Sequence, residues 1–198
     1  LAPLSAFALL RVSELVGHNE RTLFTFLAKN DPHSLLEFMI CERPTADCAT
    51  IDLVYDYFQD LLRKEIFNTA IHSVWAKTDT ALRQVNRTSE KEILKAIAII
   101  SMIQDERFKA IPSHIKAALM MDDDVFSTAV SQLQKKHIVS QRDSSGFVLL
   151  TANGVDVQKN VENYVNSKVP KADCADSLEC SFSQGYVMRR SYNDQYGR

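Results

Sequence analysis

The 198-residue sequence contains few of the residues that interrupt or cross-link a chain, with five glycines, five prolines and four cysteines. This scarcity, with 45% hydrophobic and 24% charged residues, excludes collagen-like, low-complexity and disordered classes and is typical of a helix-rich globular protein. An excess of charge of either sign is also missing, because 23 Lys and Arg face 25 Asp and Glu, for a net charge of -2. Nucleic acid or an anionic membrane would therefore need a local basic patch.

Long hydrophobic runs and targeting signals are missing as well. No stretch reaches the roughly 18 consecutive apolar residues of a membrane helix, and the first residues lack the basic start of a signal peptide. We therefore expect a cytoplasmic protein with no membrane partner. Because the sequence does not begin with Met, we also expect it to be a piece of a longer chain.

Spacings typical of metal binding and catalysis are not found in the sequence. Cys41 and Cys48 are seven residues apart and Cys174 and Cys180 are six apart, whereas zinc sites use pairs about two to four residues apart. The five histidines form no pair at metal-ligand spacing, and no nucleophile motif or P-loop (G-x-x-x-x-G-K-[ST]) is present. We therefore predict reduced thiols, no metal site and no enzymatic activity for this chain alone.

The first 87 residues predict a domain of helices. Residues 3–40 have helical apolar spacing in three short segments, the first of which includes Phe7, Leu10, Leu15 and Val16. Asp31 and Pro32 form a start signal for the third segment, in which the Asp caps the helix and the Pro takes its first position.

Residues 50–85 contain neither Gly nor Pro and keep an apolar period near 3.6 that includes Ile66. They predict one long helix, or two in tandem with a break near 68–69 or at 77–80, where poor helix formers gather. The aromatic residues of this stretch stand at helical spacing, which favours a core position over a ligand site: Tyr55, Tyr57, Phe58 and Trp75.

Residues 88–169 show the element order of a winged-helix domain. Ser89 and Glu92 form a capping box for a first helix, and Ile111-Pro112 opens a second. Three aspartates, 122–124, favour the positive end of a third helix. This position at a helix start explains the acidic cluster better than a cation site does. The inward residues of that helix are predicted to be Phe126, Val130 and Leu133.

A β-hairpin is predicted next, because two short apolar and β-branched runs, 137–141 and 147–151, flank the polar segment 142–146. Residues 152–168 supply a further helix, and residues 170–198 have the composition of a linker or tail toward a next domain. The predicted fold is thus mainly α, with a helical domain at 1–87 followed by a winged-helix domain at 88–169 that carries a small β-hairpin.

A winged helix raises the possibility of DNA binding through its third helix and its wing. The charge argues against the simple form of this function, because residues 89–167 hold nine Lys or Arg and ten Asp or Glu, and the third helix begins with three aspartates. The candidate DNA contacts are Lys135, Lys136 and Arg142. A surface that faces another protein is the alternative.

The segment 15–27, LVGHNERTLFTFL, followed by Asp31-Pro32-His33, a helical stretch and a winged-helix pattern, resembles the region downstream of the P-loop core in large bacterial ATPases of the AAA+/STAND type. It is also similar to the lid and winged-helix order of origin-recognition ATPases. The resemblance implies that the short helices form a lid, and that Arg21 senses the phosphates of ATP bound with Mg in the parent protein. A guanidinium suits that task because it binds phosphate in a bidentate manner. The alternative for Arg21 is a surface ion pair with Glu14 or Glu20.

Together these features predict a non-catalytic regulatory fragment of a larger bacterial P-loop ATPase. In that interpretation Arg21 links the nucleotide to the lid, and the helix at 51–85 carries the movement to the winged helix. The partners are the ATPase core and the downstream domain of the same chain, and a protein or duplex DNA at the winged helix. Two alternatives remain open: a winged-helix DNA-binding regulator and a winged-helix protein-interaction scaffold.

Overall fold

The computed structural model describes residues 1–16, 23–40, 48–142, 146–150, 161 and 164. The chain divides into two units, Leu1–Val155 and Asp156–Arg198, and the elements discussed below belong to the first. Within the described ranges the protein is mainly helical, with eight helices and one antiparallel hairpin. Of the predicted helix at 152–168 only residues 161 and 164 are described. The tail at 170–198 and three of the cysteines lie outside these ranges, while Cys48 is a free thiol.

Helix α1 (Pro3–Leu15) starts with a proline in its first turn, as expected from the missing amide hydrogen of that residue. Its buried face consists of Ser5, Ala8, Leu9 and Val12. Leu10, which belongs to the apolar spacing of this segment, lies outside the buried face, with its side chain 46% exposed.

Two short helices follow, α2 (Leu23–Ala28) and α3 (Leu35–Ile40). The predicted start of α3 at Asp31-Pro32 was wrong. His33 has a left-handed φ of 64°, which a right-handed helix does not allow, and the helix begins two residues later. Ser34 caps α3 instead, because its Oγ accepts a hydrogen bond from the Glu37 amide at 3.2 Å.

Residues 51–84 form two helices, α4 (Ile51–Lys64) and α5 (Thr69–Gln84). The break near 68–69 is thereby confirmed, and Asn68 caps α5 by accepting from the Ile71 amide at 3.3 Å. The predicted core position of the α4 aromatics is confirmed too, since Tyr55, Tyr57 and Phe58 are fully buried. Tyr57 makes edge-to-face contacts with Phe26 and Phe58, each with ring centroids 5.0 Å apart.

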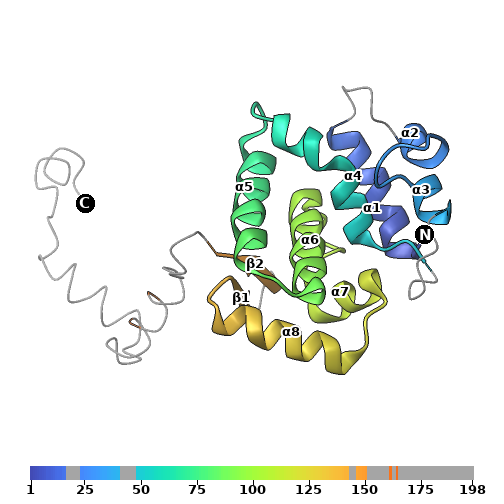
Figure 1. The fold of residues 1–198 in the computed structure, drawn as a ribbon. Helices are drawn as coiled ribbons and strands as arrows, with labels where there is room; N and C mark the ends of the chain where they lie inside the picture. Colours follow the sequence, from blue (N-terminus) through green and yellow to red (C-terminus); the bar gives the residue numbers. More distant parts are fainter. Residues whose placement is uncertain (17–22, 41–47, 143–145, 151–160, 162–163, 165–198) are drawn as a thin grey trace, which may run out of the picture. The chain divides into compact units, whose positions relative to one another are not determined.

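Helix α6 (Thr88–Ile103) is the centre of the unit and contacts α1, α4, α5, α7, α8 and β2. Figure 1 shows it in the middle, with α5 on one side and α1 and α4 on the other. Its sequence suits that place because most of its residues from 93 onward are apolar, and these are almost fully buried: Ile93, Leu94, Ala96, Ile97, Ala98, Ile99 and Ile100. One hydrophobic cluster therefore spans the described helices from α1 to α8 and the hairpin.

The predicted capping box at the start of α6 was wrong. The helix begins at Thr88, and Arg87 precedes it without a side-chain capping bond. Glu90 in the first turn is 1% exposed, whereas Arg87 and Thr88 at the helix start are exposed.

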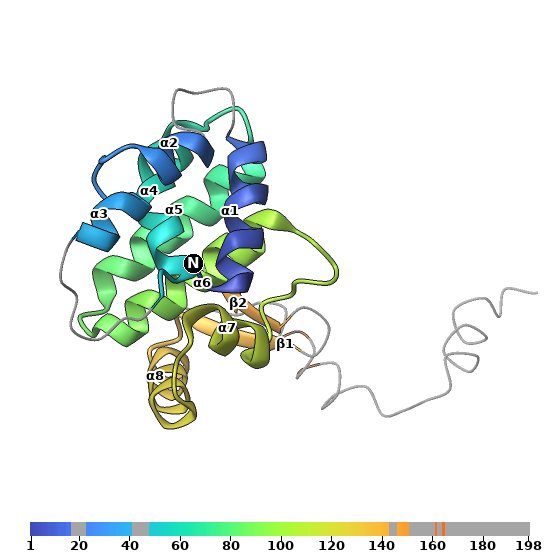
Figure 2. The same ribbon diagram turned by 90° about the vertical axis from the view of Figure 1, so that its right-hand side faces the viewer.

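The last described elements are α7 (Pro112–Leu119), α8 (Asp123–Lys135), β1 (Val139–Arg142) and β2 (Gly146–Leu149). These positions confirm the predicted helices and the hairpin, whose register pairs Val139 with Leu149 and Arg142 with Gly146. In α8 the buried residues are Phe126, Ala129 and Leu133, whereas Val130 is half-buried. Figure 2 shows α8 and the hairpin at the end of the unit away from α2 and α3.

The hairpin is tied to the connection between α6 and α7. The Phe147 amide donates to the Ala110 carbonyl at 2.8 Å, and Ala110 forms a bridge with Gly146. Gly146 has a φ of +79°, and a Cβ there would lie 2.4 Å from the Ala110 oxygen, so only glycine fits. No helix within the described ranges is long and apolar enough to cross a membrane.

Candidate partner-binding surface

The three cations predicted as DNA contacts have different surroundings. Lys136, which follows α8, places its Nζ 2.7 Å from the Glu90 Oε2 at the start of α6. Because the Glu90 side chain is 1% exposed, this lysine neutralises a buried carboxylate. Lys135 is exposed and forms no ion pair with the described residues, and Arg142 at the end of β1 is half-buried.

The outward face of α8 is polar and carries little positive charge. Its exposed residues are Asp123, Asp124, Val125, Ser127, Thr128, Ser131, Gln134 and Lys135. At the N-terminal end, Asp123 pairs with Lys116 of α7, and Asp122 and Asp124 are exposed beside it. Three carboxylates thus lie at one end of this face, and Lys135, which has no ion pair with the described residues, lies at the other.

The hydroxyl groups on this face are held close to the helix. Ser127 donates to the Asp124 carbonyl at 3.1 Å and Ser131 donates to the Ser127 carbonyl at 2.8 Å. Their oxygens remain able to accept hydrogen bonds from a partner. The face therefore offers hydrogen-bond acceptors at Ser127 and Ser131, the polar side chains of Thr128 and Gln134, and one apolar side chain, Val125, which is 46% exposed. This arrangement suits the polar rim of a protein interface better than the phosphate backbone of DNA.

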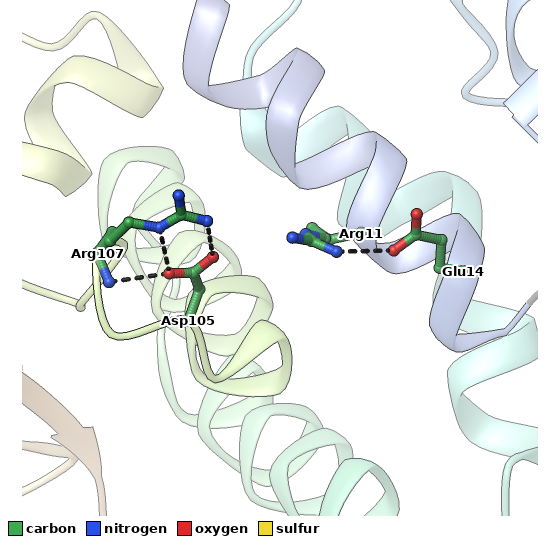
Figure 3. A network of polar contacts seen from close by, with 4 residues as sticks. All are labelled: Arg11, Glu14, Asp105 and Arg107. Carbon is green, nitrogen blue, oxygen red and sulfur yellow. Dashed lines mark hydrogen bonds and ion pairs between the residues drawn. The ribbon is translucent and has the colours of Figure 1, made fainter.

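A polar cavity of about 600 Å³ lies between the end of α1 and the connection after α6. Arg11 pairs with Glu14 at 3.1 Å, and Arg107 pairs with Asp105 through its Nη2 at 3.0 Å and its Nε at 3.2 Å. Hydrogen bonds from the Arg107 side chain and backbone lower the pKa of Asp105 to about 2. Figure 3 shows the two pairs facing each other across this cavity.

This cavity does not have the composition of a catalytic or anion-binding site. Each of its guanidinium groups already has a carboxylate partner, and Glu106 adds a further negative charge to the lining. Among the residues that the structure describes, no group of three or more His, Cys, Asp or Glu side chains is placed to hold a metal ion. Helix α1 also contacts the connection after α6 through Phe7, whose ring lies against Phe108 with centroids 5.6 Å apart.

Sequence reasoning missed a second surface, at the turn between α4 and α5. Ile66 was predicted to be part of the apolar helix face, but the helix ends at Lys64 and Ile66 is 66% exposed. Its neighbour Phe67 is 99% exposed. The apolar period continued through the turn, so no local signal distinguished these residues from core.

The predicted nucleotide sensor, Arg21, lies outside the described residues. Glu14, one of its two alternative ion-pair partners, pairs with Arg11. Comparisons of this chain with family models, curated proteins and solved structures give no match. The function is therefore inferred from the charges and contacts described above.

Proposed function

We propose that this chain is a non-catalytic winged-helix module that binds another protein, and that it is the regulatory part of a larger P-loop ATPase. The order α6, α7, α8, β1, β2 supports the winged-helix assignment, as does the pairing of Ala110, before α7, with Gly146 of the hairpin. The ATPase part of the proposal depends on the resemblance at residues 15–27 and at Arg21, with ATP and Mg bound by the parent protein.

The observation that carries the preference for a protein partner is the Lys136–Glu90 ion pair. This ion pair occupies Lys136, one of the three candidate cations, with a buried carboxylate. In addition, three exposed aspartates, 122–124, lie at the start of the adjoining helix α8. A DNA-binding helix needs positive charge at that end because the duplex backbone is strongly negative. A protein partner with donors for the Ser and Thr oxygens fits this face without repulsion.

The helix that would transmit movement to the winged helix differs from the one that the sequence indicated. The sequence-based hypothesis assigned it to one helix over residues 51–85, but α4 and α5 are separate helices. Helix α6 packs against α1, α4 and α5 as well as α7, α8 and β2. We therefore assign the coupling to α6, whose displacement by the lid would shift the α8 face directly.

Binding to duplex DNA at two salt concentrations tests the choice of partner. We expect no salt-dependent binding below about 10 μM at roughly 50 mM salt. Tighter binding that weakens steeply at about 200 mM salt, and that weakens further in the variant Lys135→Ala, would replace this proposal with the DNA-binding alternative.

The regulatory role is tested in the longer protein that contains the P-loop. Ser131→Arg on the α8 face should change ATP turnover or its response to the partner, whereas the control Ser73→Arg, at an exposed position of α5, should not. Arg21→Ala should alter nucleotide affinity or turnover. If both Arg21→Ala and Ser131→Arg leave nucleotide affinity and turnover at wild-type values, the regulatory role is wrong.

A further inference from the structure

The turn between α4 and α5 exposes two large apolar side chains side by side in the sequence. Phe67 is 99% exposed and Ile66 is 66% exposed, although turns usually carry Gly, Asn, Asp or Ser. Arg63 and Lys64, which the half-buried Glu65 separates from these two residues, are also exposed and form no ion pair with other described residues. An apolar tip next to two cations is thus presented to solvent.

This tip, defined as residues 63–67, has a well-defined backbone. The Ile66 amide donates to the Lys64 carbonyl at 2.8 Å, and Asn68 caps α5 through its side chain and also accepts from the His72 amide at 3.0 Å. Helices α4 and α5 contact each other and both pack on α6. A partner that receives Phe67 therefore loses little affinity to ordering of the loop, which is the property of a preorganised anchor residue.

A matching cavity lies elsewhere on the same protein. It has a volume of about 410 Å³, sits between the end of α6, the connection to α7 and β2, and includes no residue of the tip. We call it the α6–β2 pocket. Its apolar lining is formed by Ile100, Phe108, Ala110, Phe147 and Val148.

The α6–β2 pocket complements the tip in size, polarity and charge. Its volume has room for a phenyl ring, and the buried rings of Phe108 and Phe147, which are 4% and 2% exposed, form part of its floor. Two carboxylates and one cation, Lys109, line the pocket, but Asp105 is already paired with Arg107, so Glu106 is the carboxylate that could meet a cation of the tip. Glu106 is exposed and has no ion-pair partner among the described residues, which leaves it available to Lys64 or Arg63 of another molecule.

We propose that this chain self-associates head to tail, with Phe67 of one copy inserted into the α6–β2 pocket of a second copy. The tip and the pocket are different surfaces of the molecule, so each copy has one tip and one pocket. Repetition of the tip-to-pocket contact from copy to copy gives a closed ring or an open chain. The interaction uses neither the α8 face nor Arg21, so it is independent of the function proposed above.

Sedimentation velocity of the 198-residue chain over about 5 to 500 μM tests this inference. The weight-average sedimentation coefficient should rise with concentration in the wild type. Phe67→Ser should weaken the association by about tenfold or more, whereas Phe24→Ser, which changes a 76% exposed phenylalanine of α2, should leave it unchanged. Circular dichroism melts should show that both variants remain folded, because neither side chain is buried.

A charge exchange identifies the pocket. Lys64→Glu alone and Glu106→Lys alone should each weaken the association, and the two substitutions together should restore most of it. The inference is wrong if the wild type stays monomeric up to about 500 μM, if Phe67→Ser and Phe24→Ser act equally, or if the double charge variant is no stronger than the single ones.

Discussion

The ion pair between Lys136 and Glu90 yields the most direct test of whether α8 presents its positive charge to a partner. Lys136→Met keeps most of the side-chain length but removes the positive charge 2.7 Å from a carboxylate that is 1% exposed. Breaking a fully buried pair costs about 3–5 kcal/mol, because the remaining charge has neither water nor a partner. The Lys136 side chain is 39% exposed, so water partly replaces the lost charge, and we expect a loss of about 2 kcal/mol in the free energy of unfolding.

The matched control is the neighbouring residue. Lys135→Met also removes one lysine, but from an exposed position without an ion pair among the described residues, so its effect should stay within about 0.5 kcal/mol. Urea unfolding of both variants measures the free energies directly. In thermal melts the difference corresponds to a decrease of about 4–8 °C for Lys136→Met, from the roughly 2–4 °C per kcal/mol typical of this chain length.

A double-mutant cycle assigns the loss to the pair itself. Glu90→Gln removes the charge of the carboxylate with little change of shape, and once it is present Lys136→Met should cost at least about 1 kcal/mol less than in the wild type. Equal effects of Lys136→Met and Lys135→Met, or additive effects of Glu90→Gln and Lys136→Met, would refute the assignment. Lys136 would then be an available surface cation, and the DNA-binding alternative would regain it.

Four further substitutions test the stability of the fold. Gly146→Ala places a methyl group 2.4 Å from a backbone oxygen of the α6–α7 connection and should cost about 2 kcal/mol or more; a melting temperature within about 1 °C of the wild type would contradict the clash. Tyr57→Phe removes a hydrogen bond to the Thr25 hydroxyl at 2.9 Å and should cost about 1 kcal/mol. Tyr55→Phe should instead be neutral or stabilising by up to about 1 kcal/mol, because the buried Tyr55 hydroxyl has no hydrogen-bond partner in the described part of the chain. Equal losses in the free energy of unfolding for the two tyrosine variants, measured by urea unfolding, would contradict this. Burial, and next the charge of a nearby aspartate, raise the pKa of Glu92, so the folded state binds a proton there more tightly than the unfolded state. The resulting loss of stability is absent at low pH and develops as pH rises through the raised pKa. Glu92→Gln should therefore stabilise the protein at about pH 7 but not at about pH 4. An equal gain in the free energy of unfolding at both pH values, measured by urea unfolding, would contradict this.

Much of the secondary structure was predictable from local sequence. The prolines at the starts of α1 and α7, the apolar period of α6 and the polar segment between β1 and β2 act within a few residues, so they retain their meaning without knowledge of the fold. The break between α4 and α5 was predictable for the same reason, since Asn68 favours a cap over a helix interior.

Predictions of helix boundaries were wrong where two local start signals competed, or where the helix ended before its apolar period did. At α3 both Asp31-Pro32 and Ser34 are start signals, and the left-handed backbone of His33 selected the second. Ile66 fits the apolar period of α4, but the helix ended two residues before it. The candidate surface on α8 was predictable only in part. The sequence shows which residues the helix carries, but it does not show that Lys136 pairs with Glu90.

By itself the sequence determined the mainly helical character of the described unit and the order of its helices and hairpin, because periodicity, caps and turn residues act over short stretches of chain. The tertiary structure alone decided which side chains are available to a partner. Glu90 and Lys136 are 46 residues apart in the chain and meet only when α8 packs on α6. The exposure of Phe67 and the apolar α6–β2 pocket likewise follow from how the helices pack on α6, since contacts between distant segments are absent from any local pattern.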